Sequence, residues 1–204
     1  MKPEIQIINT RAEHILQLVE LQIICYPTLA DTSRLKRPHF ESHLRIFPEG
    51  QWVALDGSRV VGMSAGFLCT FDFNHPDHTF DEIIAFGFFT QHDPQGQHFY
   101  GADVSVHPTH RGRGISRLLY NARKDLVRRL GLRGIVTGGM IPGFARYKDS
   151  LDASTYVARV VAGEIFDPTL SVQLRQGFRV RGLLPHYLPD TATDGWSVLI
   201  EWVP

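Results

Sequence analysis

A strand, a loop rich in glycine and arginine, and an amphipathic helix follow one another without interruption in residues 101–126, GADVSVHPTHRGRGISRLLYNARKDL. In the loop, three small residues alternate with three larger ones: Gly112, Gly114 and Ser116 with Arg111, Arg113 and Ile115. A loop that enters a helix can direct unpaired backbone N–H groups and the positive end of the helix dipole at one point, an arrangement that binds anions. Glycine permits positive φ there and lets a ligand approach the backbone closely. The stretch therefore predicts a site for phosphate oxygens; a tight turn that merely starts the helix is the alternative.

Two common phosphate-binding patterns do not fit this loop. The dinucleotide pattern GxGxxG requires a third glycine where Arg117 stands, and the Walker pattern requires a Gly-Lys-Ser/Thr sequence that the chain lacks. The pattern that fits is Arg-x-x-Gly-x-small across residues 111–116, directly after VSVHP. The predicted site therefore belongs to neither of these two classes.

Composition narrows the classes of protein further. Hydrophobic residues make up 43% of the 204 residues and charged residues 21%, as in soluble globular proteins. The formal net charge is zero, so we expect no overall attraction to nucleic acid or to a membrane surface.

Cys25 and Cys69 each lie in apolar sequence, which predicts two reduced core thiols. The first residues have no signal-peptide pattern, and no apolar run reaches the ~20 residues that cross a bilayer. A single cytoplasmic domain over residues 1–204 is expected.

Hydrophobic periodicity and turn signals predict the order of the elements. The expected elements are strand 4–10, helix 10–26, helix 38–47, hairpin 51–68, strand 99–106, helix 115–130, strand 133–140, an extra helix at about 152–163, helix 167–177, and strands 178–185 and 195–203. Thr10 and Glu13 form a predicted capping box, and Asp56-Gly57 marks the hairpin turn. Gly131 is expected to end the long helix.

At its loop residues the chain resembles the GNAT superfamily of acyl-CoA-dependent N-acyltransferases. The likeness includes the two early helices, the hairpin, VHPTHRGRG, and LRQGF before the last strands. It implies an α/β (α+β) fold with a mixed, mostly antiparallel twisted sheet flanked by helices. The chain is also similar to the acyltransferase-like domain that precedes a carbon–nitrogen hydrolase domain in some bacterial proteins. That second likeness lies in GGMIPGFARYKD and RGLLPHYLPD.

The resemblance implies how coenzyme A binds. The loop would grip the pyrophosphate, and the preceding strand would pair with the pantetheine arm and polarise the thioester carbonyl. The residues expected to bind acetyl-CoA are Val104, Ser105, Val106, Arg111, Gly112, Arg113, Gly114, Ile115 and Ser116. Arg117 is a further candidate for neutralising a phosphate. The other arginines of the helix, Arg123, Arg128 and Arg129, are expected on a solvated face opposite the leucine stripe.

Transfer of an acyl group to an amine requires a base, donors for the oxyanion, and protonation of the thiolate. Asp103 matches the position where relatives carry an acidic base, and an ordinary polar strand residue is the alternative. Relatives carry a tyrosine as the acid where this chain has Gln173. Either Tyr147, Tyr156 or Tyr187 takes that role, or the thiolate leaves unaided, because a free thiol has a pKa of only ~8.5.

Residues 72–98 are polar, aromatic and rich in histidine, and we interpret them as a long insertion at one edge of the sheet. His75, His78, His92 and Asp93 match no zinc spacing, so no metal is predicted. We expect the insertion and residues 146–163 to shape the site of the acceptor amine. Its phenylalanines are expected in a lid or in oligomer packing, and a homodimer is left open.

Three functions follow as hypotheses. The first is transfer of an acyl group, with acetyl favoured, from acyl-CoA to an amine of a small molecule or peptide. The second is a catalytically weak acyl-CoA-binding module that regulates a partner, for which a hydrolase is a candidate. The third is a purely structural interaction domain.

Overall fold

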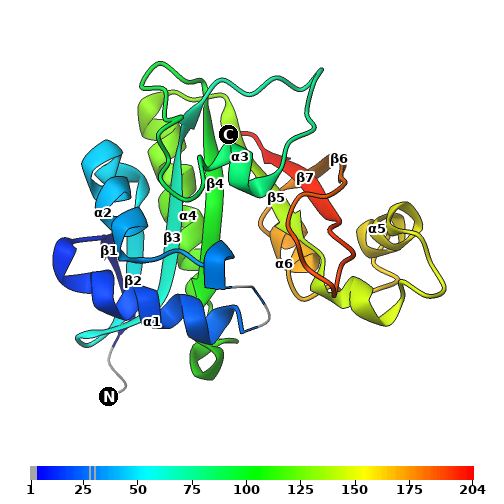
Figure 1. The fold of residues 1–204 in the computed structure, drawn as a ribbon, viewed down its shortest axis with the longest axis horizontal. Helices are drawn as coiled ribbons and strands as arrows, with labels where there is room; N and C mark the ends of the chain where they lie inside the picture. The colour runs from blue at the N-terminus through cyan, green and yellow to red at the C-terminus, as the bar shows by residue number, and fades with distance from the viewer. Residues whose placement is uncertain (1–3, 28, 30) are drawn as a thin grey trace.

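Seven strands form one twisted sheet in the computed structural model, which describes residues 4–27, 29 and 31–204 (Figure 1). The strand order is β1-β2-β3-β4-β5-β7-β6, and every neighbouring pair is antiparallel except β4 and β5. The strands are β1 (Gln6–Asn9), β2 (Trp52–Asp56), β3 (Arg59–Cys69), β4 (His98–Val106), β5 (Gly134–Met140), β6 (Arg179–Leu184) and β7 (Ser197–Trp202). The predicted mixed, mostly antiparallel fold class is confirmed.

Helices cover both faces of this sheet. They are α1 (Ile15–Cys25), α2 (Arg37–Ile46), α3 (Phe80–Ile83), α4 (Ile115–Leu130), α5 (Ala153–Val161) and α6 (Leu170–Arg175), with short 3-10 turns between them. In Figure 1, α1 and α2 lie in front of β2 to β4, and α4 lies behind them. The extra helix α5 lies at the far end of the sheet, where it packs on α6. Within the described part of the chain, no helix is both long and apolar enough to span a bilayer.

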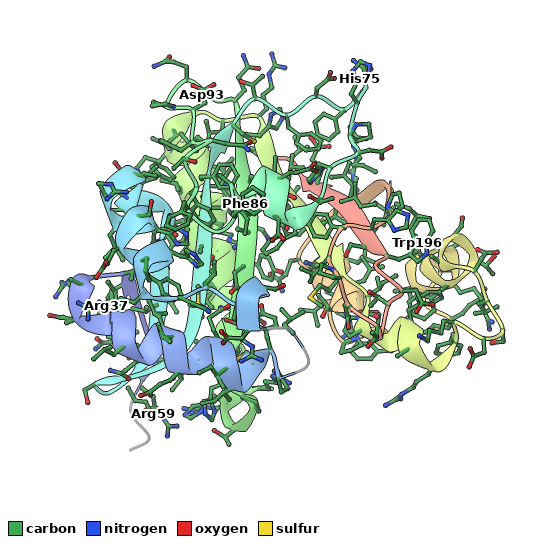
Figure 2. All side chains as sticks on the ribbon, in the orientation of Figure 1. Arg37, Arg59, His75, Phe86, Asp93 and Trp196 are labelled. Carbon is green, nitrogen blue, oxygen red and sulfur yellow. The ribbon has the colours of Figure 1, made fainter. Side chains whose placement is uncertain are left out.

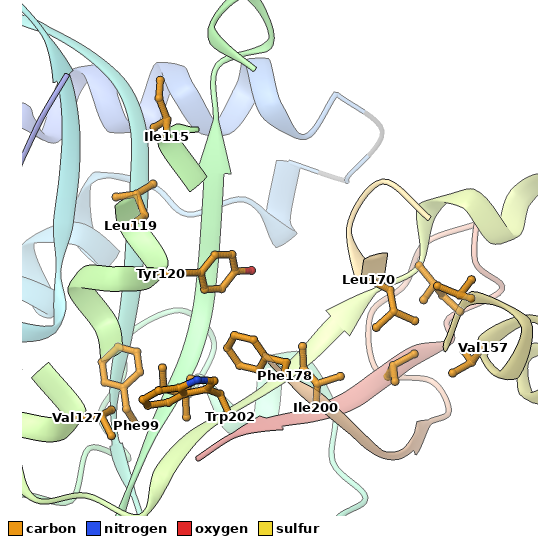
Figure 3. Close-up of a cluster of buried hydrophobic side chains, with 14 of the residues drawn as sticks. Phe99, Ile115, Leu119, Tyr120, Val127, Val157, Leu170, Phe178, Ile200 and Trp202 are labelled. Carbon is orange, nitrogen blue, oxygen red and sulfur yellow. The ribbon is translucent and has the colours of Figure 1, made fainter. Parts of the chain in front are cut away.

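Two hydrophobic clusters fill the space between helices and sheet. Residues of α4, β5 and β7 form the cluster behind the sheet, and Figure 3 shows part of it, including Leu119, Phe99 and Trp202. Residues of α1, α2, β3 and the insertion form the cluster in front. Each residue of a β-strand faces the side opposite to its neighbour. Phe99 accordingly packs behind the sheet, whereas Tyr100 packs in front.

One irregularity in β4 changes which side chains face α1. Ala65 pairs with Asp103 and Gly66 pairs with Gly101, so Ala102 is an extra residue that bulges out of the ladder. A bulge of one residue reverses the alternation of the side chains beyond it. As a result Asp103, like Tyr100, faces the front of the sheet.

The parallel pair β4–β5 is short. Its register extends only from His98, opposite Gly134, to Tyr100, opposite Val136. Beyond these three residue pairs the strands diverge, so residues 101–106 and 137–140 are not paired with each other through their backbones. The sheet is therefore open between β4 and β5, at the end that leads to the glycine loop.

Most local signals are confirmed, but the predicted capping box of Thr10 and Glu13 is wrong. Thr10 N–H donates to the Gln51 carbonyl at 2.9 Å, which extends the pairing of β1 with β2. The chain therefore enters its first helix one residue later, where Arg11 N–H donates to His14 Nδ1 at 3.1 Å. The extra helix starts as predicted, because the Asp152 carboxylate accepts the N–H of Thr155 at 2.7 Å. Gly131, with a φ of 64°, ends α4.

Candidate active site

The glycine loop begins α4 as predicted. Gly112 and Gly114 have positive φ values of 76° and 78°, and Gly114 is the residue that caps the helix. The first helical hydrogen bond runs from Leu118 N–H to the Gly114 carbonyl at 3.2 Å, so the N–H groups of residues 115–117 have no helical acceptor. Nothing lies within 4 Å of a Cβ built at Gly112. That glycine is therefore needed for its φ and for access, not for packing.

The arginine side chains of this loop already have partners in the protein, so they are less free to contact a ligand than the sequence suggested. Arg113 Nη1 lies 3.0 Å from Asp56 Oδ2, at the hairpin turn, so its charge is largely balanced. Arg111 Nε donates to the Val106 carbonyl at 3.2 Å at the end of β4. Arg113 is therefore paired with a carboxylate, whereas Arg111 keeps its net charge and is held at the end of β4.

The strand residues expected to hold the pantetheine arm lie beside the gap in the sheet. Val104 and Val106 pack toward the cluster behind the sheet, and Ser105 faces the front. Ser105 is buried, and its Oγ has no hydrogen-bond partner among the described residues. Their edge toward β5 is unpaired, which leaves backbone groups available to an extended ligand.

Asp103 lies on the front of β4 and is only 8% exposed. Its two carboxylate oxygens accept hydrogen bonds from Gln22 Nε2 and from the Tyr26 hydroxyl, both at 2.6 Å. Burial raises the pKa of Asp103 above its ordinary value, and the hydrogen bonds from Tyr26 and Gln22 oppose that rise. A carboxylate of raised pKa is a stronger base than free aspartate. Tyr26, half-buried at the end of α1, adjoins this carboxylate.

Arg123 corrects a prediction, because it is buried rather than on a solvated face of α4. It is 1% exposed, and its guanidinium donates to Ser64 Oγ at 2.6 Å and to the Ala65 carbonyl at 2.8 Å. It also donates to the Asp103 carbonyl. The bulge disturbs the ladder at these residues, and a buried carbonyl needs a donor. Arg123 supplies it and brings a positive charge to the back of the gap. Burial lowers the pKa of Arg123 to about 10, so it stays charged at neutral pH.

Side chains replace the missing backbone pairing where β4 and β5 separate. Thr137 Oγ1 donates to the Gly101 carbonyl at 2.6 Å. On the front, the Tyr187 ring lies so close to Gly138 that a Cβ there would be 2.2 Å from it. The Tyr187 hydroxyl is 2.9 Å from that of Tyr100. These contacts close the narrow end of the gap.

The tyrosines considered from the sequence as acids are engaged elsewhere. Tyr187 bonds to Tyr100, whose hydroxyl in turn lies 2.8 Å from His78 Nε2. Tyr156 donates to Asp167 Oδ2 at 2.8 Å, under α5. The Tyr147 ring packs at a tilt against that of Tyr156, with ring centroids 5.5 Å apart. A different tyrosine, Tyr120 of α4, points its hydroxyl away from the helix (Figure 3).

The insertion covers the front of the sheet at the far end of β3 and β4. It is anchored to α2, because His43 Nε2 hydrogen-bonds the Gly87 carbonyl at 2.7 Å and the His43 ring stacks on Phe89 at 3.6 Å. Phe89 is fully buried, whereas Phe86 is 71% exposed. Figure 2 shows Phe86 in front of the central strands and His75 at the upper edge.

A cavity of about 340 Å³ lies between the insertion and β3. Its lining combines aromatic and polar side chains: Phe67, Phe71, His75 and His78, with Asp72, Asp77 and Asp93. His78 also reaches Tyr100, which faces the front of β4. Among the described residues, no group of three or more histidine, cysteine, aspartate or glutamate side chains is arranged to hold a metal ion.

Sequence reasoning missed the partners of Asp103 and the residue behind it. Gln22 lies on the buried face of α1, and a glutamine on an apolar helix face was the available signal. Tyr26 and Arg123 gave no signal, because their roles depend on how α1 and α4 meet the bulge in β4.

The open sheet, with a glycine loop that starts the helix behind it, defines the class of protein. The sequence matches the acetyltransferase (GNAT) family over residues 15–139, more than half of the chain. The chain belongs to this family, as the resemblance implied. Among its relatives, the "uncharacterized N-acetyltransferase YkwB" of Bacillus subtilis (strain 168) is 32% identical over 195 residues, 95% of this chain and 86% of that protein.

A further sequence relative and one solved structure are also similar to this chain. The "probable hydrolase YhcX" of Bacillus subtilis (strain 168) is 40% identical over 195 residues. The match includes 95% of this chain but only 37% of that protein, so the chain corresponds to a little over one third of its length. Among solved structures, the GphF GNAT-like decarboxylase in complex with isobutyryl-CoA has a TM-score of 0.84 at 23% identity, covering 97% of this chain and 98% of that one. The last likeness establishes the fold.

Proposed function

We propose that residues 1–204 act as one acyltransferase domain, which moves an acyl group, acetyl in the first place, from acyl-CoA to an amine. One observation carries the proposal: the free N–H groups at the start of α4 lie at the open end of the gap between β4 and β5. A pyrophosphate at the loop and an extended arm along an unpaired strand edge would satisfy both sets of backbone groups. Val104 to Val106 would then line the arm.

The reaction needs one proton removed and one supplied. The amine nitrogen attacks the thioester carbon, the C–N bond forms, and the C–S bond breaks as the tetrahedral intermediate collapses. We assign the base to Asp103, acting through the Tyr26 hydroxyl, which donates to its Oδ1. The amine proton would pass to Tyr26 as the tyrosine proton passes to the carboxylate. The raised pKa of Asp103 favours this transfer.

The acceptor would approach from the front, on the side of the insertion. The cavity beneath the insertion has the size of a small-molecule site and is lined by aromatic rings together with carboxylates. Carboxylates favour a protonated amine, and the rings add cation–π attraction. We therefore infer that the acceptor arrives as an ammonium ion, which loses one proton to solvent before the neutral amine attacks. Residues 146–163, on the far side of β6 and β7, are a weaker candidate for covering it.

A regulatory acyl-CoA-binding module is the second candidate. Both oxygens of Asp103 are hydrogen-bonded, and Gln173 stands where a tyrosine acid was expected. The similarity to part of a protein named as a probable hydrolase suggests a hydrolase as the partner in that case. Both cysteines are free thiols, the state maintained in reducing compartments, so a cytoplasmic location stays our prediction. A homodimer also stays a prediction.

Calorimetric titration with acetyl-CoA, followed by thiol release over a panel of amines, separates the two candidates. Transfer supports the acyltransferase. Tight binding without transfer to any amine supports the regulatory module, and no binding contradicts both. Malonyl-CoA and isobutyryl-CoA serve as alternative donors to test acyl selectivity.

A further inference from the structure

Gln22 and Tyr26 lie one turn apart at the C-terminal end of α1, and each holds one carboxylate oxygen of Asp103. Gln22 Nε2 donates to Oδ2 and the Tyr26 hydroxyl donates to Oδ1, both at 2.6 Å. The main chain links the same two residues, because Tyr26 N–H donates to the Gln22 carbonyl at 3.0 Å. Residues four apart on a helix lie on one face. The last turn of α1 therefore fixes the carboxylate at two points.

The side-chain amide of Gln22 is fully engaged within the protein. Its Oε1 accepts the N–H of Leu35 at 3.3 Å, and Nε2, besides donating to Asp103, lies 3.5 Å from Met63 Sδ. The carboxylate can only accept and the Leu35 N–H can only donate, so the amide has one orientation. Gln22 is 3% exposed. A buried amide with these partners has no group left for a substrate, so its contribution is the placement of Asp103.

The two oxygens of Asp103 are not equivalent when the carboxylate takes up a proton. A protonated carboxyl group has one O–H donor, and its carbonyl oxygen remains the better acceptor. A proton on Oδ2 would weaken the hydrogen bond from Gln22, whereas a proton on Oδ1 preserves it and faces the Tyr26 oxygen. The amide therefore favours protonation of the oxygen that is connected to Tyr26.

We propose that Gln22 is a positioning residue for the acyl transfer, which holds the Asp103 carboxylate against Tyr26 and directs its proton to Oδ1. This role rests on the proposed function, in which Asp103 is the base. As the C–N bond forms, the nitrogen proton passes to the Tyr26 oxygen, and the tyrosine proton passes to Oδ1. After the product leaves, the proton returns through Tyr26 to solvent and the carboxylate is restored. No other reactant is required.

The acid limb of the pH profile can be assigned to Asp103. Other titratable groups of the described chain act on its charge: Tyr26 and Cys25 of α1, and Tyr120 and Arg123 of α4. Burial raises the pKa of both tyrosines above the ordinary value and that of Cys25 to about 11, and it lowers the pKa of Arg123 to about 10. Each of these groups keeps one protonation state below neutral pH, so the acid limb reports on Asp103.

The test replaces Gln22 by methionine, which has an unbranched side chain of similar length and no amide. Loss of a hydrogen bond to the carboxylate raises the pKa of Asp103. In Gln22→Met we therefore expect the acid limb of kcat to move up by about 1 to 2 pH units. At the plateau, kcat should fall by about 10-fold, because the carboxylate is no longer held against Tyr26. KM for acetyl-CoA should not change.

Gln22→Glu is the conservative variant, and it should restore activity over part of the pH range. Its carboxyl group can still accept the Leu35 N–H and, when protonated, donate to Asp103. Two carboxyl groups this close share one proton, which is lost at a raised pKa. Activity should approach that of the wild type on the acid side of this value and fall as the pH rises through it. Gln22→Met loses activity at low pH instead, and a side chain needed only for packing would not give opposite shifts.

Gln51→Met is the matched control. Gln51 is also 3% exposed, and its amide donates to the carbonyls of Phe47 and Gly66 at 2.9 and 2.7 Å. The substitution should lower Tm and leave the pH profile in place. An acid limb that stays in place in Gln22→Met, or that moves equally in Gln51→Met, overturns the role of Gln22.

An NMR titration of the Asp103 carboxyl carbon measures the same pKa without turnover, which separates the role of Gln22 from the proposed function. The pKa should be higher in Gln22→Met than in the wild type, and equal values overturn that role. If the pKa rises as expected but the wild type acetylates no amine, the proposed function fails, while the hold of Gln22 on the carboxylate stands.

Discussion

The two faces of β4 prepare this protein for its two substrates by different means. Behind and below the strand, the proposed CoA side consists mainly of main-chain groups: free N–H groups at the start of α4 and an unpaired strand edge. In front, the proposed acceptor side consists of side chains from α1 and from the insertion. Main-chain recognition needs particular φ values and therefore glycines at fixed positions, which leave a pattern in the sequence. Side-chain recognition leaves no such pattern.

Among these variants, replacement of Asp103 should change turnover the most. In Asp103→Asn the base is lost, so turnover with acetyl-CoA should fall by about 100-fold or more, while CoA affinity stays near that of the wild type. Steady-state kinetics and calorimetry on the same preparation measure both quantities. Loss of affinity together with turnover would mean that the front and back of β4 are not separate parts of the site.

The wild-type pH profile sharpens this prediction. Catalysis requires the carboxylate, and the pKa of Asp103 is raised. The acid limb of kcat should therefore lie above the ordinary range of an aspartate. Tyr26→Phe removes both the proposed proton relay and a hydrogen bond that stabilises the carboxylate. We therefore expect kcat to fall and the acid limb of the remaining activity to move to still higher pH.

Replacing Gly112 tests the main-chain side. In Gly112→Ala the positive φ is strained by roughly 1–2 kcal/mol, and the new methyl group keeps the phosphate away from the backbone. We expect CoA affinity to fall by about tenfold. Gly163→Ala is the matched control, because Gly163 also has a positive φ, 79°, with nothing within 4 Å of its Cβ position. Similar losses of Tm with unequal losses of CoA affinity would support the site; equal affinities would contradict it.

The attachment of the insertion to α2 should depend on pH. Burial lowers the pKa of His43 from 6.5 to about 3. The unfolded state therefore binds a proton at higher pH than the folded state does, and the stabilisation present above pH 6.5 is lost as the pH falls toward 3. The slope approaches about 1.4 kcal/mol per pH unit. Burial also lowers the pKa of other histidines, so denaturation of His43→Leu should show a smaller slope than the wild type rather than none. An unchanged slope would show that these other groups cause it.

The smallest effect is expected at the cavity under the insertion. Asp77→Asn removes one carboxylate of the lining and should raise KM for a cationic acceptor a few-fold, in keeping with an exposed charge pair worth about 0.2–1 kcal/mol. KM for acetyl-CoA should not change. Added salt should reduce the difference between the variant and the wild type, whereas a salt-independent effect would contradict an electrostatic role.

The same contrast explains which features the sequence could predict. The glycine loop, the hairpin turn and the helix that Asp152 caps each depend on neighbouring residues, and all three were found. Arg123 was placed on a solvated face because its true partners, carbonyls of β3 and β4, lie 58 and 20 residues away in the chain.

The brief parallel contact of β4 with β5 has a consequence for motion in this sheet. Three residue pairs and a few side chains join its two parts, so amides along 101–106 and 137–140 that face the gap should exchange with deuterium early. An extended ligand bound between β4 and β5 would pair with the backbone on both sides, as an additional strand would. Its arrival should slow that exchange on both sides together, and its departure should restore it.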